Sequence, residues 1–119
     1  MADSIMLEKS KELAVDTVLI GKEIIQNQKE YVLTRQLIKS GTSVGANIHE
    51  SKYAQSTADF ISKMQIALKE CYESEYWLEI MHKTGYLNEN DFQKLITKCR
   101  EIRRMLIASI NTAKSNGSS

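Results

Sequence analysis

Glu79 and His82 stand three residues apart in a segment with helical periodicity, the spacing with which helical bundles hold metal ions. A di-metal carboxylate site needs two such Glu-x-x-His pairs and two further inward-facing glutamates. The other histidine of the chain is His49, and Ala46 rather than a glutamate stands three positions before it. The second pair is missing, so we expect no metal and no other cofactor. His82 lies near a predicted helix end, where positive character suits the helix dipole.

Three side chains are candidate nucleophiles, namely Ser43, Cys71 and Cys99. A nucleophilic cysteine needs a histidine or another activating base in a polar cleft. Both cysteines lie on apolar stripes of predicted helices, which is typical of reduced thiols in a protein core. Ser43 has no histidine in helical phase with it. We therefore expect a protein that is not an enzyme.

The stretch SGTSVGANIHES, residues 40–51, places Gly41 and Gly45 inside a pattern that otherwise predicts uninterrupted helix. A glycine in a helix interior costs about 1 kcal/mol relative to alanine. A phosphate-binding loop would need GxxxxGK[ST] or GxGxxG between a strand and a helix, and this stretch matches neither motif. The GxxxG spacing instead puts both small residues on one helix face, which lets another backbone approach. We expect close helix packing here.

A polar stripe runs along the edge of the apolar face of this same helix. Small polar groups beside a core usually hydrogen-bond to a neighbouring helix, because burying them unpaired costs about 1–3 kcal/mol each. The pattern favours an interhelical or intersubunit network, and a binding site for a ligand is the alternative. The polar stripe consists of Gln36, Ser40, Ser43, Asn47 and Glu50.

The composition predicts that helices position all of these residues. The chain of 119 residues contains no proline, is 42% hydrophobic and 26% charged, and is long enough for one domain. Alanine, leucine, lysine, glutamate and isoleucine are plentiful, which favours helix. Charged residues near the start prevent a signal-peptide core, and no apolar run approaches the ~18 residues that span a bilayer. We expect a cytoplasmic protein with no membrane and no small-molecule substrate.

Apolar residues recur at three- and four-residue steps in four segments. The first covers about 4–28 and the second about 32–54. The third begins after Ser56, which can cap a helix with Asp59 three residues on, and Gly85 ends it. The fourth begins near residue 88 and continues to the polar tail. The segments predict an all-α, antiparallel up-down four-helix bundle over residues 1–115, with 116–119 as a disordered polar tail.

Two surfaces of the predicted bundle could bind a partner. The third segment has a second apolar face formed by Ile66, Trp77 and Ile80, which suggests an oligomer interface because aromatic residues concentrate in interface cores. The alternative is that Trp77 packs over a loop or a helix end. The fourth segment is basic and could contact phosphates, although an ordinary solvated helix explains the same charges. Its candidate nucleic-acid-binding residues are Lys94, Lys98, Arg100, Arg103 and Arg104.

Three stretches resemble a known family: VLTRQLIKSGTSVGANIHES, ADFISKMQIALKE and YWLEIMHKTGYL. They are similar to the four helix bundle proteins, also called the 23S rRNA-intervening sequence protein family. The family signature S-x-x-A-N-[IV]-x-E-[GA] falls on residues 43–51, where Ser51 replaces the usual glycine or alanine. The resemblance implies a bundle that assembles as a ring-like homopentamer. Related pentameric bundles are accessory proteins of diversity-generating reverse transcriptases, where they are thought to bind nucleic acid.

Together these patterns predict a non-enzymatic, self-assembling helical bundle that serves as a scaffold or accessory protein associated with RNA or DNA. The alternative is a structural protein–protein interaction module with no nucleic-acid role. A metal or small-molecule binder in the bundle core is a third and weaker hypothesis. A net charge of +1 does not by itself attract nucleic acid, so the hypothesis depends on where the charges lie.

Overall fold

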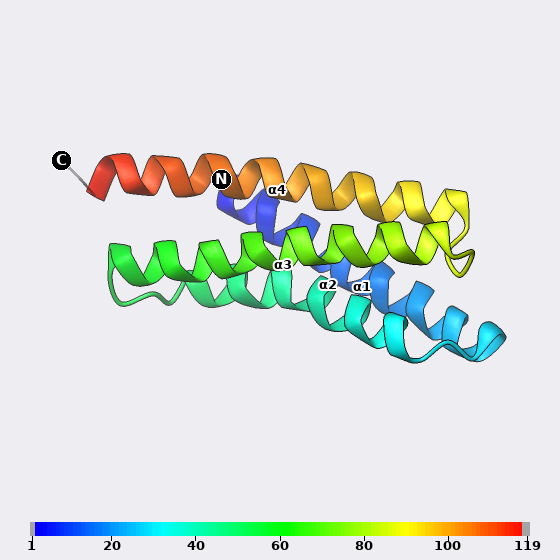
Figure 1. Cartoon of the computed structure of the whole chain (residues 1–119). Coiled ribbons are helices and arrows are strands. Elements are labelled where there is room, and N and C mark those ends of the chain that lie inside the picture. Colours follow the sequence, from blue (N-terminus) through cyan, green and yellow to red (C-terminus); the bar gives the residue numbers. More distant parts are fainter. Residues whose placement is uncertain (1, 118–119) are drawn as a thin grey trace.

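The computed structural model describes residues 2–117, which form four helices joined by short loops. The helices are α1 (Ala2–Gln28), α2 (Val32–Ser51), α3 (Thr57–Lys83) and α4 (Glu89–Gly117). Each helix packs against the next one antiparallel, and α4 closes the bundle against α1 (Figure 1). The described residues contain no strand, so the predicted all-α four-helix bundle is confirmed.

One apolar core runs along the 52 Å long axis of the bundle, and all four helices contribute to it. It takes most of the apolar residues that recur at helical spacing, because such a stripe can be buried only against other helices. None of the helices in the described part of the chain is long and apolar enough to cross a membrane. Among the largest fully buried side chains are Leu13, Leu37, Ile48, Met64, Leu78, Leu95, Ile102 and Leu106.

The boundaries of α3 follow from capping residues. The Ser56 hydroxyl accepts a hydrogen bond from the Asp59 amide at 3.0 Å, and the Asp59 carboxylate accepts one from the Gln55 amide at 3.1 Å. Such bonds satisfy amides that have no partner inside the helix. At the other end Gly85 has a φ of +85°, the left-handed conformation that glycine adopts without strain. Both features agree with the sequence prediction.

The link between α1 and α2 uses less usual residues. Lys29 has a φ of 58°, a left-handed conformation that few side chains other than glycine favour. The Glu30 carboxylate accepts hydrogen bonds from the amides of Val32 and Leu33, both at 3.1 Å. It also accepts bonds from the amide and the hydroxyl of Thr34, both at 2.8 Å. Glu30 therefore supplies the negative charge that the start of α2 favours.

Two predicted boundaries differ from the observed ones. The second helix ends at Ser51 rather than near residue 54, because the chain turns there towards the cap of α3. The fourth helix continues through residues 116 and 117, which the sequence assigned to a disordered tail. Gly117 lies against Thr57, since a Cβ on this glycine would be 3.2 Å from the Thr57 methyl group. Residues 118 and 119 of the predicted tail lie outside the described residues.

Candidate functional site

The polar stripe on α2 divides into one side chain that bonds to another helix and four that do not. Ser40 is buried and accepts a hydrogen bond from the Ser74 hydroxyl of α3 at 2.9 Å. The Ser43 hydroxyl and the Asn47 amide each donate to a backbone carbonyl one turn earlier in α2, at 2.7 and 2.8 Å. Bonds of this kind satisfy a side chain without a partner helix. The remaining two members, Gln36 and Glu50, are exposed.

Gly41 and Gly45 lie where α1 crosses α2. A Cβ on Gly41 would be 3.0 Å from the Thr17 side chain, and one on Gly45 would be 3.0 Å from the Ser10 hydroxyl. Gly21 lies on the α1 side of the same seam, where a Cβ would be 2.7 Å from Ile38. The two helices are therefore too close for larger side chains at these positions. Nothing in the sequence indicates that Gly21 lies in this contact, because a single glycine forms no spacing motif.

His82 and the two cysteines pack against other side chains or lie in the core. His82 lies in the last turn of α3, where its ring stacks on Phe92 with centroids 4.1 Å apart. Its Nε2 atom is 3.0 Å from a carboxylate oxygen of Glu89. Within residues 2–117 no three histidine, cysteine or carboxylate side chains gather as they would around a metal ion. Burial raises the pKa of the Cys99 thiol to about 12 and also raises the pKa of Cys71, which disfavours the nucleophilic thiolate of both.

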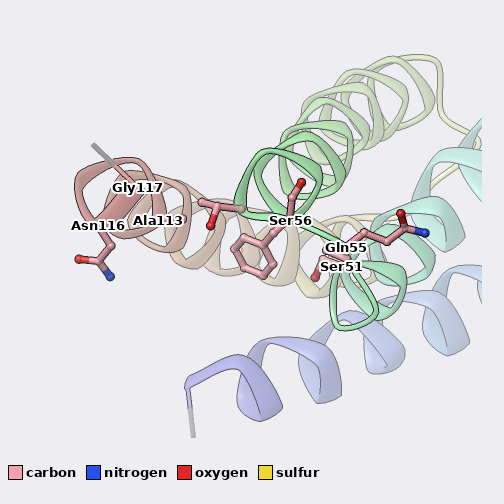
Figure 2. A pocket seen from close by; sticks show the side chains of 9 residues that line it. Ser51, Gln55, Ser56, Ala113, Asn116 and Gly117 are labelled. Atoms are coloured by element: carbon pink, nitrogen blue, oxygen red, sulfur yellow. The ribbon is translucent and has the colours of Figure 1, made fainter. Parts of the chain in front are cut away.

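One surface hollow lies between the α2–α3 loop and the last turns of α4, with a volume of about 480 Å³ (Figure 2). Ser51, Gln55 and Ser56 line one side of it, and Ala113 lies across from them on α4. None of the nine lining residues has an ionisable side chain, so the lining offers hydroxyl and amide groups but no general base. Such a lining can bind a polar group, but it does not point to catalysis.

The predicted oligomer-interface residues differ in exposure. Ile66 is exposed, whereas Trp77 and Ile80 are half-buried. Trp77 packs against the core of its own chain, and its Nε1 atom donates to the Glu73 carboxylate at 3.2 Å. Trp77 is thus partly buried against its own chain, and part of its surface remains exposed.

Other large apolar side chains are more exposed, and sequence analysis did not single them out. On α1 these are Ile5, Val15 and Leu19, of which the last two are four residues apart and lie opposite the buried face of that helix. On α3 they are Tyr72 and Tyr76, which are also four residues apart. The repeated four-residue spacing was the available signal in both pairs, since such residues share a helix face.

The lysines among the candidate nucleic-acid-binding residues are paired with α1. Lys98 lies 2.9 Å from a carboxylate oxygen of Glu12 and 3.5 Å from one of Asp16, and Lys94 lies 3.7 Å from Asp16. The hydrogen bond from Lys98 lowers the pKa of Glu12, and the same bond raises the pKa of Lys98. These two lysines therefore hold α1 against α4, and a phosphate would have to compete with the carboxylates for them.

Arg100 and Arg103 lie on the other side of α4, next to α3. Arg103 makes a two-pronged contact with the Glu75 carboxylate, at 2.8 and 3.3 Å, and its guanidinium lies over the Tyr72 ring. Arg100 shares the same carboxylate at 3.9 Å. Arg104 is exposed, and among residues 2–117 no carboxylate is within ion-pair distance of it. The structure thus places Lys94 and Lys98 on the α1 side of α4 and Arg100 and Arg103 on the α3 side. Arg104 follows Arg100 by one helical turn and is exposed.

Two comparisons with known proteins place the chain among relatives. A family model described as "23S rRNA-intervening sequence protein" matches residues 2–108. A crystal structure of a protein with unknown function from the S23 ribosomal protein family, from Bacteroides thetaiotaomicron VPI-5482, is similar with a TM-score of 0.91 and 44% sequence identity. The similarity covers 93% of this chain and 99% of that one. A comparison with curated proteins gave no match.

Proposed function

The chain belongs to the 23S rRNA-intervening sequence protein family, and from this premise we propose that it is a non-enzymatic, self-assembling bundle that associates with RNA or DNA as a scaffold or accessory protein. The family name does not itself demonstrate ribosome binding. The proposal rests instead on the distribution of charge, because phosphate contacts supply most of the affinity of proteins that bind nucleic acid without sequence specificity.

The observation that carries the proposal is the excess of positive charge beside α3. Two guanidiniums, those of Arg100 and Arg103, share the single carboxylate of Glu75. One positive charge is therefore left over, and the exposed Arg104 adds a second one. Copies of such a face in an assembly would bind one polyanion more tightly than a single copy does, because linked sites add avidity.

The proposed assembly is a homo-oligomer, and the family resemblance implies a pentamer. Ile66 and the exposed edges of Trp77 and Ile80 lie on one side of α3 and are the proposed subunit contacts. Trp77→Ala should then reduce the mass of the assembly. A matched control is Tyr53→Ala, because Tyr53 is an exposed aromatic residue in the loop before α3. An unchanged mass for the Trp77 variant would remove this residue from the interface.

Native mass spectrometry of protein purified at low salt without nuclease tests both parts of the proposal. We expect a mass above that of one oligomer which falls to an integral number of chains after nuclease treatment. A clean oligomer without bound nucleic acid would support the assembly and contradict the nucleic-acid role. A mass of 13.6 kDa, that of a single chain, would contradict the assembly.

The second candidate function is a protein–protein interaction module. Val15 and Leu19 favour it, because they expose an apolar patch on the outer face of α1, away from the basic side chains next to α3. Val15→Ser with Leu19→Ser should leave nucleic-acid retention unchanged under the first function. If this double variant loses a bound protein while Arg100→Gln with Arg104→Gln does not, the result supports the protein–protein interaction module over the nucleic-acid role.

A further inference from the structure

We propose that the side of the bundle shared by α3 and α4 binds single-stranded nucleic acid, with unpaired bases stacking on Tyr72 and Tyr76 and the neighbouring arginines contacting phosphates. This inference rests on the function proposed above. It adds the class of nucleic acid that is bound and the side chains that recognise it. We call this surface the α3–α4 flank.

Two tyrosine rings form the aromatic part of the α3–α4 flank. Tyr72 and Tyr76 are 50% and 56% exposed, and neither belongs to the core cluster. Residues four apart on a helix are neighbours, with Cβ atoms about 5–6 Å apart. The Trp77 ring meets the Tyr76 ring edge-on, with centroids 5.0 Å apart and planes at 75°. This contact restrains the Tyr76 ring without covering its exposed surface.

One cation lies over the Tyr72 ring and still leaves this residue 50% exposed. The Arg103 guanidinium is 5.4 Å from the Tyr72 ring centroid, and Glu75 holds it there through two hydrogen bonds. Arg100 contacts the same carboxylate, and Arg104 follows it by one helical turn. Stacking surfaces interleaved with phosphate-binding cations are the combination that single-strand-binding proteins use.

The net charge of the α3–α4 flank is positive even when its acidic residues are counted. Lys69 shares the face of Tyr72 and Tyr76 because it precedes them by three and seven residues. Glu73 and Glu79 lie three residues on either side of Tyr76. The flank therefore carries four cationic and three acidic side chains, a formal net charge of +1. Its charged residues are Lys69, Glu73, Glu75, Glu79, Arg100, Arg103 and Arg104.

The exposed rings favour a single strand over a duplex. Bases inside a duplex are stacked on one another, so a protein ring can stack only on a base that is unpaired or at an end. A polyanion without bases, or a duplex, would use the arginines alone and leave both rings in water. An acidic protein surface could also use the arginines, and the experiment below separates it from a single strand.

Fluorescence anisotropy with a labelled oligouridylate, an oligothymidylate of equal length and the matching RNA duplex tests the inference on the full chain. We expect both single strands to bind more tightly than the duplex. Tyr72→Ala with Tyr76→Ala should weaken single-strand binding by about tenfold or more, because the bases can no longer stack on the two rings. Tyr72→Phe with Tyr76→Phe keeps the rings and should bind like the wild type. The tighter of the two strands then assigns RNA or DNA.

One control variant and two possible outcomes keep the two proposals apart. Arg100→Gln with Arg104→Gln should weaken binding and reduce its salt dependence. The slope of the logarithm of the binding constant against the logarithm of the salt concentration should fall in magnitude by about 0.7 for each phosphate of a single strand that the variant no longer neutralises. If this variant weakens binding and the tyrosine-to-alanine variant does not, stacking is wrong and the nucleic-acid role stands. If the wild type binds none of the three probes, both proposals are wrong.

The tyrosine variants also need a check of fold and assembly. Equal thermal unfolding midpoints for the alanine and phenylalanine double variants would show that a loss of binding is not a loss of fold. Native mass spectrometry of the alanine variant should give the wild-type number of chains. A smaller assembly would make the α3–α4 flank a subunit contact and would overturn the inference.

Discussion

At the scale of single residues, the seam between α1 and α2 contains a buried polar atom that lacks a partner. The Thr17 hydroxyl is buried there, and in the described part of the chain no hydrogen-bond partner lies within reach of it. It lies against Gly41, since a Cβ on that glycine would be 3.1 Å from the hydroxyl oxygen. An unpaired buried hydroxyl costs about 1–3 kcal/mol of stability. The close approach of α1 and α2 therefore lowers the stability of the protein at Thr17.

Replacing that hydroxyl by a methyl group should stabilise the protein. Thr17→Val has nearly the same shape and removes the unpaired polar atom, so we expect the free energy of unfolding to rise by about 1 kcal/mol. Urea denaturation followed by circular dichroism measures it. Thr17→Ser keeps the hydroxyl and loses the methyl group, so it should be less stable than the wild type. A Thr17→Val protein that is less stable would mean that a water molecule bonds to the hydroxyl.

Gly41 should tolerate no large side chain. Gly41→Leu places bulk where Thr17 already lies at contact distance, and overpacking of this kind typically costs about 1–3 kcal/mol. Ala46→Leu is the matched control, because Ala46 is exposed on the same helix. Denaturation midpoints of both variants at the same protein concentration make the comparison. Equal midpoints would contradict the close packing of α1 on α2.

The residue scale also shows what the amino-acid sequence could predict. The GxxxG spacing identified the face of α2 that another backbone approaches. It could not identify Thr17 or Gly21 as the contacts, because these depend on the angle at which α1 crosses α2. The polar stripe predicted hydrogen-bonded side chains but not their partners. A serine that bonds to its own helix and a serine that bonds to a neighbouring helix have the same sequence pattern.

At the scale of the elements, the start of α2 depends on one carboxylate. Partial burial alone would raise the pKa of Glu30, but the hydrogen bonds from Thr34 and from the backbone amides outweigh it and lower the pKa below its ordinary value of 4.5. The charged form is therefore favoured in the folded protein. Its contribution to stability is present above pH 4.5 and is lost as the pH falls through the lower pKa of the folded state.

Glu30→Gln should remove part of this acid sensitivity. At neutral pH we expect the variant to unfold with a free energy lower by about 1 kcal/mol, as for loss of a helix cap. Near pH 3, where the wild-type carboxylate is increasingly protonated, the difference between the two proteins should shrink. Thermal melts across this pH range measure it, with Glu23→Gln, an exposed position on α1, as the control. A constant difference would mean that the charge of Glu30 has no role.

The elements differed in how well they could be predicted. Ser56, Asp59 and Gly85 mark the ends of α3 because their residue types are those that caps use. The start of α2 has no such signal: Tyr31 occupies the N-cap position and makes no side-chain cap bond. Lys29 takes a left-handed conformation that its residue type does not predict. The cap of α2 comes instead from Glu30, a residue type outside the usual N-cap set and one position before the N-cap.

At the scale of the whole molecule, charged pairs hold α4 to both of its neighbours. On one side, Lys98 and Lys94 bond to carboxylates of α1, and Lys9 of α1 lies 2.9 Å from Glu101 of α4. On the other side, Arg103 bonds to Glu75 of α3. The basic residues of α4 could be identified from the sequence, but not which of them are paired with a carboxylate. Pairing depends on which acidic residue of another helix faces them, and helical periodicity does not contain that information.

Weakening the α1–α4 pairs should loosen α1 more than the other helices. Lys98→Gln removes the ion pairs with Glu12 and Asp16, and solvent keeps the contribution of such exposed pairs small. We expect amide hydrogens of α1 to exchange about two- to fivefold faster, with those of α2 and α3 changed less. Hydrogen-exchange mass spectrometry measures this, with Lys39→Gln on α2 as the control. Uniform acceleration in all helices would contradict the prediction.

The short loops have a consequence for the kinetics of folding. Three of the four helix–helix seams join helices that are consecutive in the chain, and only the α1–α4 seam joins distant ones. Most contacts are therefore local in sequence, a topology that folds in microseconds to milliseconds because little loop entropy is lost before contacts form. Without any proline, the chain also has no slow prolyl isomerisation to wait for. The closure of α4 against α1 is then the step that brings the most distant parts of the sequence together.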